Sequence, residues 1–119
     1  MSDYSGIDPA GLARLNKFGG PAFVKKMIDL FLEEVPDRLS AARRGEEAGD
    51  LTTVAEAAHS LKASAQNFGA SDLSRIAGEI ELRTRANKRE NLSTLLSEME
   101  AAYNTAKVWL ERERDALKI

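Results

Sequence analysis

Apolar side chains recur every three or four residues along most of this chain, which is the spacing of amphipathic helices. Their pattern predicts a short helix over residues 9–17 and four longer helices over residues 21–47, 50–68, 71–84 and 92–116. No alternating run of β-branched residues indicates a strand. Four long amphipathic helices joined by short loops predict an all-α fold, an antiparallel up-and-down four-helix bundle. The short extra N-terminal helix should cover one end of it.

Residues that start, break and end helices support these boundaries. Asp8 and Pro9 form a strong helix start, and Gly19-Gly20 ends the short helix before Pro21 opens the next. Pro36 lies inside the second helix and should bend it, because proline removes a backbone hydrogen bond. The remaining signals are a C-terminal glycine at Gly49, an N-cap at Asp50, a C-terminal glycine at Gly69, an N-cap at Ser71 and a polar break at residues 85–91.

The predicted core is one apolar row on each long helix. Its members are Val24, Met27, Ile28, Phe31, Val35, Leu39 and Ala42; Val54, Ala58, Leu61, Ala65 and Phe68; Leu73, Ile76, Ala77 and Ile80; and Leu92, Leu95, Leu96, Met99, Tyr103, Ala106 and Leu110. The chain's one histidine, His59, lies outside these rows, about 140° around its helix from Val54. Lys62 and Gln66 share its side. His59 is therefore expected to face solvent.

Composition narrows the function classes. The 119 residues are 43% hydrophobic and 30% charged, as in an ordinary soluble domain, and we expect one domain over residues 1–119. A net charge of −2 provides no general basic surface for nucleic acid, and without cysteine there is no thiol nucleophile or thiolate metal site. No apolar run reaches the ~20 residues of a membrane span, and the N-terminus lacks signal-peptide features, so a cytoplasmic monomer is expected.

The stretch Ala58-His59-Ser60-Leu61-Lys62-Ala63-Ser64 resembles the motif of the histidine phosphotransfer (HPt) domain family, Ala-His-x-Leu-Lys-Gly-Ser-Ser, and Gly69-Ala70 matches the pair that follows it. Ala63 replaces the family glycine that lets a partner approach closely. The resemblance implies a phosphorelay intermediate that carries a phosphoryl group on His59 between receiver-domain aspartates. It also implies response-regulator receiver domains and a hybrid sensor histidine kinase as partners. Mg²⁺ would be on the receiver, so no cofactor is expected in this chain. The sequence contains no ATP-binding motif, so we expect no kinase activity.

Neighbours of His59 suit that chemistry. Lys62, three residues on, is placed to offset phosphoryl charge, and Gln66 to donate a hydrogen bond to a phosphoryl oxygen. Ala55 and Ala63, one turn to either side of the histidine, leave with Gln66 a shallow surface for partner docking. Residues at equal distances before and after the turn near Gly69 should lie level with each other, which places Glu81 opposite His59, with Arg85 one turn away. Glu81 is expected to accept the Nδ1–H of His59, which leaves Nε2 as the nucleophile.

Two other functions stay open. One is a non-catalytic interaction module, an adaptor or inhibitor that binds a kinase or receiver domain. The other is a carboxylate-bridged metal enzyme, since Glu56 and His59 have the Glu-x-x-His spacing of such bundles, although no second copy occurs. A basic group, Arg83, Arg85, Lys88 and Arg89, is most simply a solvated helix end, and alternatively steers an acidic receiver face.

Overall fold

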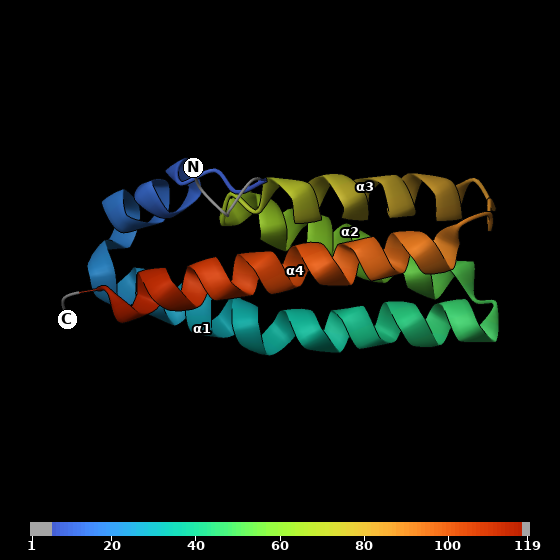
Figure 1. The fold of residues 1–119 in the computed structure, drawn as a ribbon, viewed down its shortest axis with the longest axis horizontal. Helices are drawn as coiled ribbons and strands as arrows, with labels where there is room; N and C mark the ends of the chain where they lie inside the picture. Colours follow the sequence, from blue (N-terminus) through green and yellow to red (C-terminus); the bar gives the residue numbers. More distant parts are fainter. Residues whose placement is uncertain (1–5, 118–119) are drawn as a thin grey trace.

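The computed structural model describes residues 6–117 and contains four helices in this range. They are α1 (Ala10–Ala48), α2 (Leu51–Asn67), α3 (Ser71–Arg85) and α4 (Leu92–Asp115). The helices run antiparallel to their chain neighbours, and α4 returns to pack against α1, so α2 and α4 occupy opposite corners (Figure 1). The predicted four-helix bundle is confirmed, and no strand occurs among the described residues.

The short N-terminal helix is present as the first part of α1. Gly20 has φ +79° and ψ −178°, which lies outside the helical region and divides α1 at the break predicted from Gly19-Gly20. The segment before Gly20 turns away from the bundle axis (Figure 1). The predicted start is shifted by one residue, because Pro9 is the N-cap and Ala10 the first helical residue. The carboxylate of Asp8, just before the cap, accepts a hydrogen bond from the backbone N–H of Ala10 at 3.0 Å. By contrast, α1 passes through Pro36 without leaving helical backbone angles.

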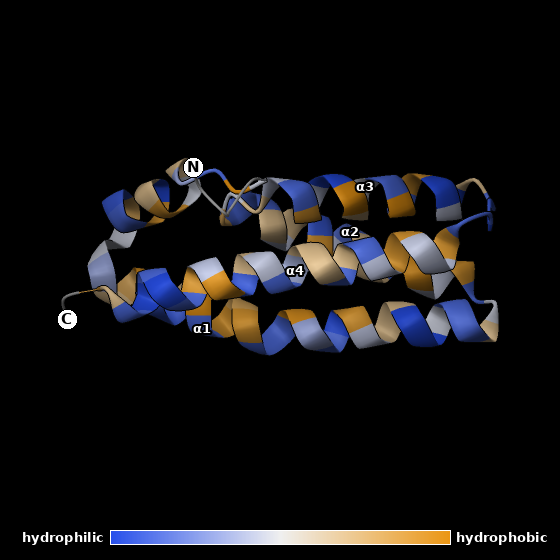
Figure 2. Ribbon diagram, in the orientation of Figure 1, coloured by the Kyte–Doolittle hydropathy of each residue, from blue (hydrophilic) through white to orange (hydrophobic). Residues whose placement is uncertain are grey.

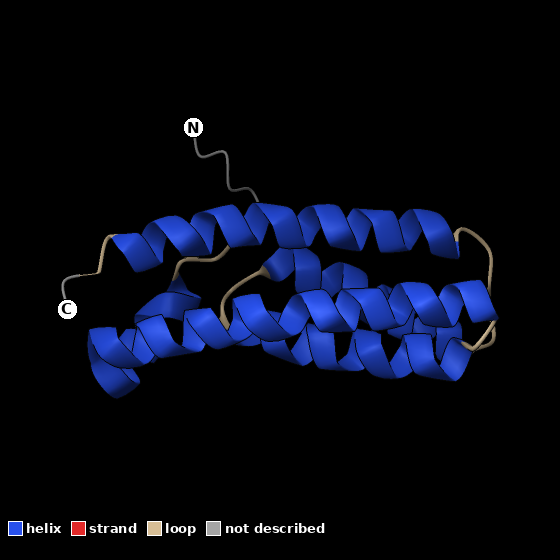
Figure 3. Ribbon diagram, turned by 90° about the horizontal axis from the view of Figure 1, so that it is seen from below, coloured by secondary structure: helices blue, strands red, loops and turns tan. Residues whose placement is uncertain are grey.

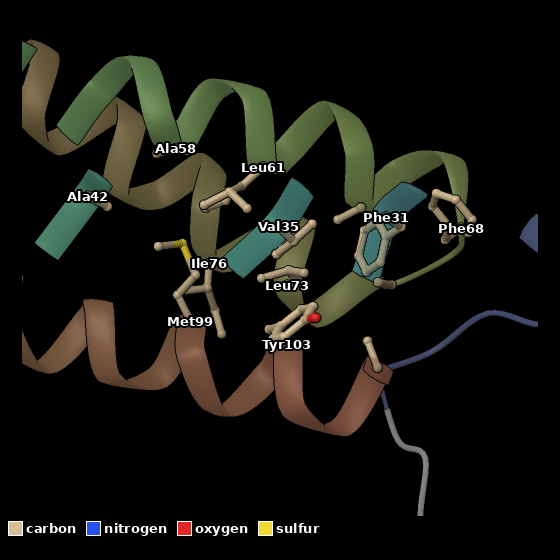
Figure 4. Close-up of a cluster of buried hydrophobic side chains, with 14 of the residues drawn as sticks. Phe31, Val35, Ala42, Ala58, Leu61, Phe68, Leu73, Ile76, Met99 and Tyr103 are labelled. Atoms are coloured by element: carbon tan, nitrogen blue, oxygen red, sulfur yellow. The ribbon is translucent and has the colours of Figure 1, made fainter. Parts of the chain in front are cut away.

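Apolar faces of all four helices meet along the bundle axis, whereas polar residues cover the outside (Figure 2). The predicted rows are buried, except that Met27 and Leu39 are partly exposed at the edge of the core. Phe31 of α1 contacts the rings of Phe68 and Tyr103, at centroid distances of 4.7 and 6.0 Å, and so ties α1 to the end of α2 and to α4 (Figure 4). A core of this kind fixes α2 in rotation, and therefore fixes which of its residues face water.

The connections between helices are short, so helices make up almost all of the described chain (Figure 3). Asp50 caps α2, because its carboxylate accepts the backbone N–H of Thr53 at 3.1 Å. Gly69 has φ +71° in the α2–α3 turn, and its carbonyl accepts the N–H of Asp8 at 2.7 Å, which pins the N-terminal segment to the turn. The prediction that Ser71 caps α3 is wrong. Ser71 is the first helical residue, and its hydroxyl donates to the Gly69 carbonyl at 3.3 Å.

None of the helices within residues 6–117 combines the length and apolar character needed to cross a bilayer. Residues 1–5, to which the expectation about a signal peptide applies, lie outside the described residues, as do residues 118–119.

Candidate functional site

His59 lies near the middle of α2 with its side chain 59% exposed. The buried residues of α2 face α1 and α3, which leaves the histidine on the outer surface of the bundle. A ring in this position is open to a second protein, as expected from its place on the helical wheel.

Glu81 of α3 lies beside the histidine. Its Oε2 is 2.9 Å from Nδ1 of His59, which confirms the pairing predicted from the α2–α3 hairpin. Unlike the histidine, the Glu81 side chain is only 12% exposed. The buried row of α3 sets its rotation, because Ile80 and Thr84 on either side of Glu81 point into the bundle.

The Glu81 carboxylate accepts from three donors at once. Lys62 Nζ lies 3.0 Å from Oε1, and Arg85 Nε lies 3.0 Å from Oε2, the same oxygen that contacts His59. Burial raises the pKa of the Glu81 carboxyl, but the hydrogen bonds from Lys62 and Arg85 and the charge of His59 outweigh it. The pKa of this carboxyl is therefore lowered, and it is ionised near neutral pH.

An ionised Glu81 fixes the tautomer of the neighbouring ring. A carboxylate only accepts hydrogen bonds, so the 2.9 Å contact requires the hydrogen of a neutral His59 ring to be on Nδ1. The other ring nitrogen, Nε2, then carries a free lone pair. The arrangement thus presents an exposed nitrogen nucleophile of defined tautomer beside two cationic side chains.

Gly78 of α3 explains how Lys62 reaches Glu81. A Cβ at this position would approach Cδ of Lys62 to 3.2 Å, which is closer than ordinary van der Waals contact. The missing side chain therefore gives the lysine stem room to cross α3. A glycine inside a helix costs about 1 kcal/mol relative to alanine, so the site is obtained at some expense of helix stability. The sequence signal for this role is an isolated glycine in the middle of α3, a position for which the apolar pattern predicts no function.

The predicted docking residues differ in position. Ala63 is exposed on α2, in agreement with the prediction. Ala55 is only 1% exposed, so its assignment to the open docking surface is wrong. The physical reason is that α2 packs against both α1 and α3, and the arc that it buries is wider than the row that faces the centre of the bundle.

Gln66 is exposed but does not join the group around Glu81. It lies seven residues beyond His59, or about 10 Å along a helix, and lines a hollow at the α2–α3 turn with Arg14, Ser71 and Arg75 among others. The structure thus brings together His59, Lys62 and Glu81, and leaves Gln66 apart.

The basic group predicted at the end of α3 is divided among separate partners. Arg83 binds Glu79 at 3.1 Å, and Arg89 contacts the carbonyl of Gly49 at 3.4 Å, so both stabilise the fold locally. Arg85 instead binds Glu81, the partner of His59. Within residues 6–117, no group of three or more histidine or acidic side chains is arranged to hold a metal ion.

Comparisons with known proteins agree with this geometry. The model of a family described as the Hpt domain matches residues 26–109. A solved structure, the histidine-containing phosphotransfer protein B (HptB) from Pseudomonas aeruginosa PAO1, has a similar fold, with a TM-score of 0.90 and 24% sequence identity. That similarity covers 96% of this chain and 98% of the other. The comparison with curated proteins found no match.

Proposed function

Because this chain belongs to the Hpt domain family, and is thus a histidine phosphotransfer protein of two-component phosphorelays, we propose that His59 carries the phosphoryl group. The observation that supports this most is the contact of its Nδ1 with the Glu81 carboxylate, which leaves Nε2 free on an exposed face. His59 is also the chain's one histidine.

The transfer step needs few groups from this chain. The lone pair of Nε2 attacks the phosphorus of a receiver's aspartyl phosphate, a nitrogen–phosphorus bond forms, and the phosphorus–oxygen bond to the aspartate breaks. The aspartate leaves as a carboxylate, so the step needs no added proton. Glu81 keeps the Nδ1–H bonded throughout and offsets positive charge on the ring. In the reverse direction, the carboxylate of a second receiver attacks the phosphorus of phosphorylated His59. A new phosphorus–oxygen bond forms, the nitrogen–phosphorus bond breaks, and Nε2 regains its lone pair.

This chemistry requires the partner proteins to supply the metal ion and the kinase activity. We assign Mg²⁺ to the receiver domain, and a hybrid sensor histidine kinase to the start of the relay. This chain then acts as a carrier without ATP-dependent kinase activity of its own. We place it in the cytoplasm as a monomer, with one domain over residues 1–119. Transfer from a receiver charged on its aspartate, read as acid-labile and base-stable phosphate on His59, tests the proposal.

Lys62 is expected to tune the reaction without performing it. Its ammonium binds Oε1 of Glu81 while His59 binds Oε2, so its charge belongs to the same bonded group as the ring. Interactions of such partly exposed charges contribute about 1 kcal/mol. Lys62→Ala should therefore slow transfer, or shorten the phosphohistidine lifetime, roughly fivefold. Lys107→Ala, at an exposed position of α4, is the matched control. An unchanged rate and lifetime in Lys62→Ala would make the lysine a bystander.

Glu81 is expected to control the tautomer of His59. Nitrogen-15 NMR at a pH where the ring is neutral should show hydrogen on Nδ1 in the wild type, and the phosphorylated protein should carry phosphate on Nε2. Hydrogen bonds to charged groups contribute about 1.5–3 kcal/mol. Glu81→Ala should therefore shift the tautomer ratio toward Nε2–H by roughly tenfold or more. Glu79→Ala, which removes the carboxylate that pairs with Arg83, should leave the ratio unchanged. A wild-type ring with its hydrogen on Nε2 would refute this role for Glu81.

A further inference from the structure

The surface on the α1 side of His59 is acidic. A groove between α1 and α2 is lined by Glu34, Asp37, Arg38, Ala41, Thr53, Glu56, Ala57 and Ser60. Three of these side chains are carboxylates and one is a guanidinium, so the groove has a net negative charge. Ser60 follows the histidine directly, which places the groove against the nucleophile's α1 side.

The surface on the α3 side has the opposite character. A second groove, between the first half of α2 and the end of α3, is lined by Leu51, Thr52, Ala55, Thr84, Arg85 and Asn87. It contains an arginine and no carboxylate. Arg85 lines this groove and contacts the same Glu81 oxygen as His59, so the groove begins beside the nucleophile as well. Two carboxylates lie near it and both are already bonded: Glu81 to Lys62, Arg85 and His59, and Asp50 to the start of α2.

Leu82 adds an apolar group to the α3 side. Its side chain is 73% exposed, whereas Leu73, Ile76 and Ile80 of the same helix are buried. It follows Glu81 directly and lies one helical turn from both Gly78 and Arg85, the residues that border the site on α3. An isolated exposed leucine is ordinary on a protein surface. Here it is the chain neighbour of Glu81, which binds His59, and it lies one turn from Arg85, which lines the groove. Leu82, Arg85 and the groove together define a surface, which we call the α3 flank.

A receiver domain complements this surface. The pocket of a receiver holds the aspartate that exchanges the phosphoryl group and further oxygen ligands for Mg²⁺, so its rim is acidic. Resting on the proposed function, we infer that the receiver docks on the α3 flank, with its acidic rim toward Arg85 and an apolar side chain over Leu82. The acidic α1–α2 groove repels the same rim and thereby fixes the orientation of the complex.

Variants of Leu82 test this orientation when two phosphoryl donors are compared. A phosphorylated receiver must dock, whereas phosphoramidate, a small donor, reaches Nε2 without docking. Leu82→Asp should lower the second-order rate constant for transfer from the receiver by about tenfold or more. The new carboxylate would lie against the apolar side chain of the receiver and close to its acidic rim. Leu82→Ala should give a smaller decrease in the same direction. The rate with phosphoramidate should stay at the wild-type value in both.

Control variants separate this surface from the alternatives. Val108 is another exposed apolar residue, on α4 at the corner opposite α2, and Val108→Asp should change neither rate. Asp37→Lys should leave transfer from the receiver unchanged or faster. Receiver transfer that is unaffected by Leu82→Asp but slowed by Asp37→Lys, or by Phe18→Ala at the kinked end of α1, would overturn the inference. Failure of wild-type His59 to accept phosphate from either donor would instead refute the proposed function.

Discussion

Replacing His59 with glutamine should abolish phosphoryl transfer from a charged receiver domain. The glutamine amide nitrogen shares its lone pair with the carbonyl group and is therefore no nucleophile. The side chain at this position is 59% exposed, so the free energy of unfolding should change by no more than about 0.5 kcal/mol. Acid-labile, base-stable phosphate should appear on the wild type and be absent from His59→Gln.

The matched control for this variant is Ser60→Ala. Ser60 is the neighbouring hydroxyl on α2, and removing it should leave acid-labile phosphate at the wild-type level. Thermal unfolding of each variant shows that the bundle is intact. Acid-labile phosphate that persists in His59→Gln would contradict the proposal. A wild-type chain that binds the receiver and accepts no phosphate would instead support a non-catalytic adaptor.

The bundle was predictable from the sequence because each helix carries its own periodic apolar row and its own boundary residues. Gly20 shows how local this information is: glycine adopts a positive φ at little cost and proline lacks the N–H of a continuing helix, so Gly-Gly-Pro by itself predicts the break that is present. Ser71 shows its limit. Both an N-cap and a first-turn position suit serine, and the Gly69 carbonyl that the Ser71 hydroxyl binds also accepts the N–H of Asp8, a residue far away in the sequence.

The site was predictable only in part, for a related reason. The contact of Glu81 with His59 follows from antiparallel packing about a turn of known position, so counting residues was sufficient. The burial of Ala55 depends on how many helices α2 contacts, and a single helical wheel does not contain that information. The role of Gly78 depends on the stem of Lys62, which lies against it. This contact between α3 and α2 becomes visible only when the two helices are placed side by side.

The neighbours of Glu81 also explain how a carboxylate is compatible with a phosphoryl site. An unpaired carboxylate beside His59 would repel the incoming group. Lys62 and Arg85 each place a positive charge within 3.0 Å of a Glu81 oxygen, so the three side chains together carry a net charge of +1. Glu81 can therefore hold the ring by Nδ1 without making the site negative. The cations are held in place before phosphate arrives, which reduces the entropy lost in binding it.

Introducing tryptophan at Ala63 should block receiver docking while preserving the fold. Ala63 is exposed on α2, one turn beyond His59, at the position where the family has glycine. An indole there projects into the space that a receiver must occupy, and its exposed position leaves the core packing intact. Transfer from the receiver should fall roughly hundredfold, equivalent to about 3 kcal/mol of lost docking energy. Phosphorylation by phosphoramidate should continue.

Two further variants at Ala63 separate steric exclusion from other effects. Ala63→Gly restores the family residue and should leave transfer from the receiver unchanged or faster, because it only removes volume from the approach path. Ala63→Ser adds one small polar atom and should remain close to wild type. Transfer would then decrease with side-chain size from glycine to tryptophan. A tryptophan variant that folds and still accepts phosphate from the receiver at the wild-type rate would show that the partner approaches His59 from another direction. In that case the docking surface around Ala63 would have to be abandoned.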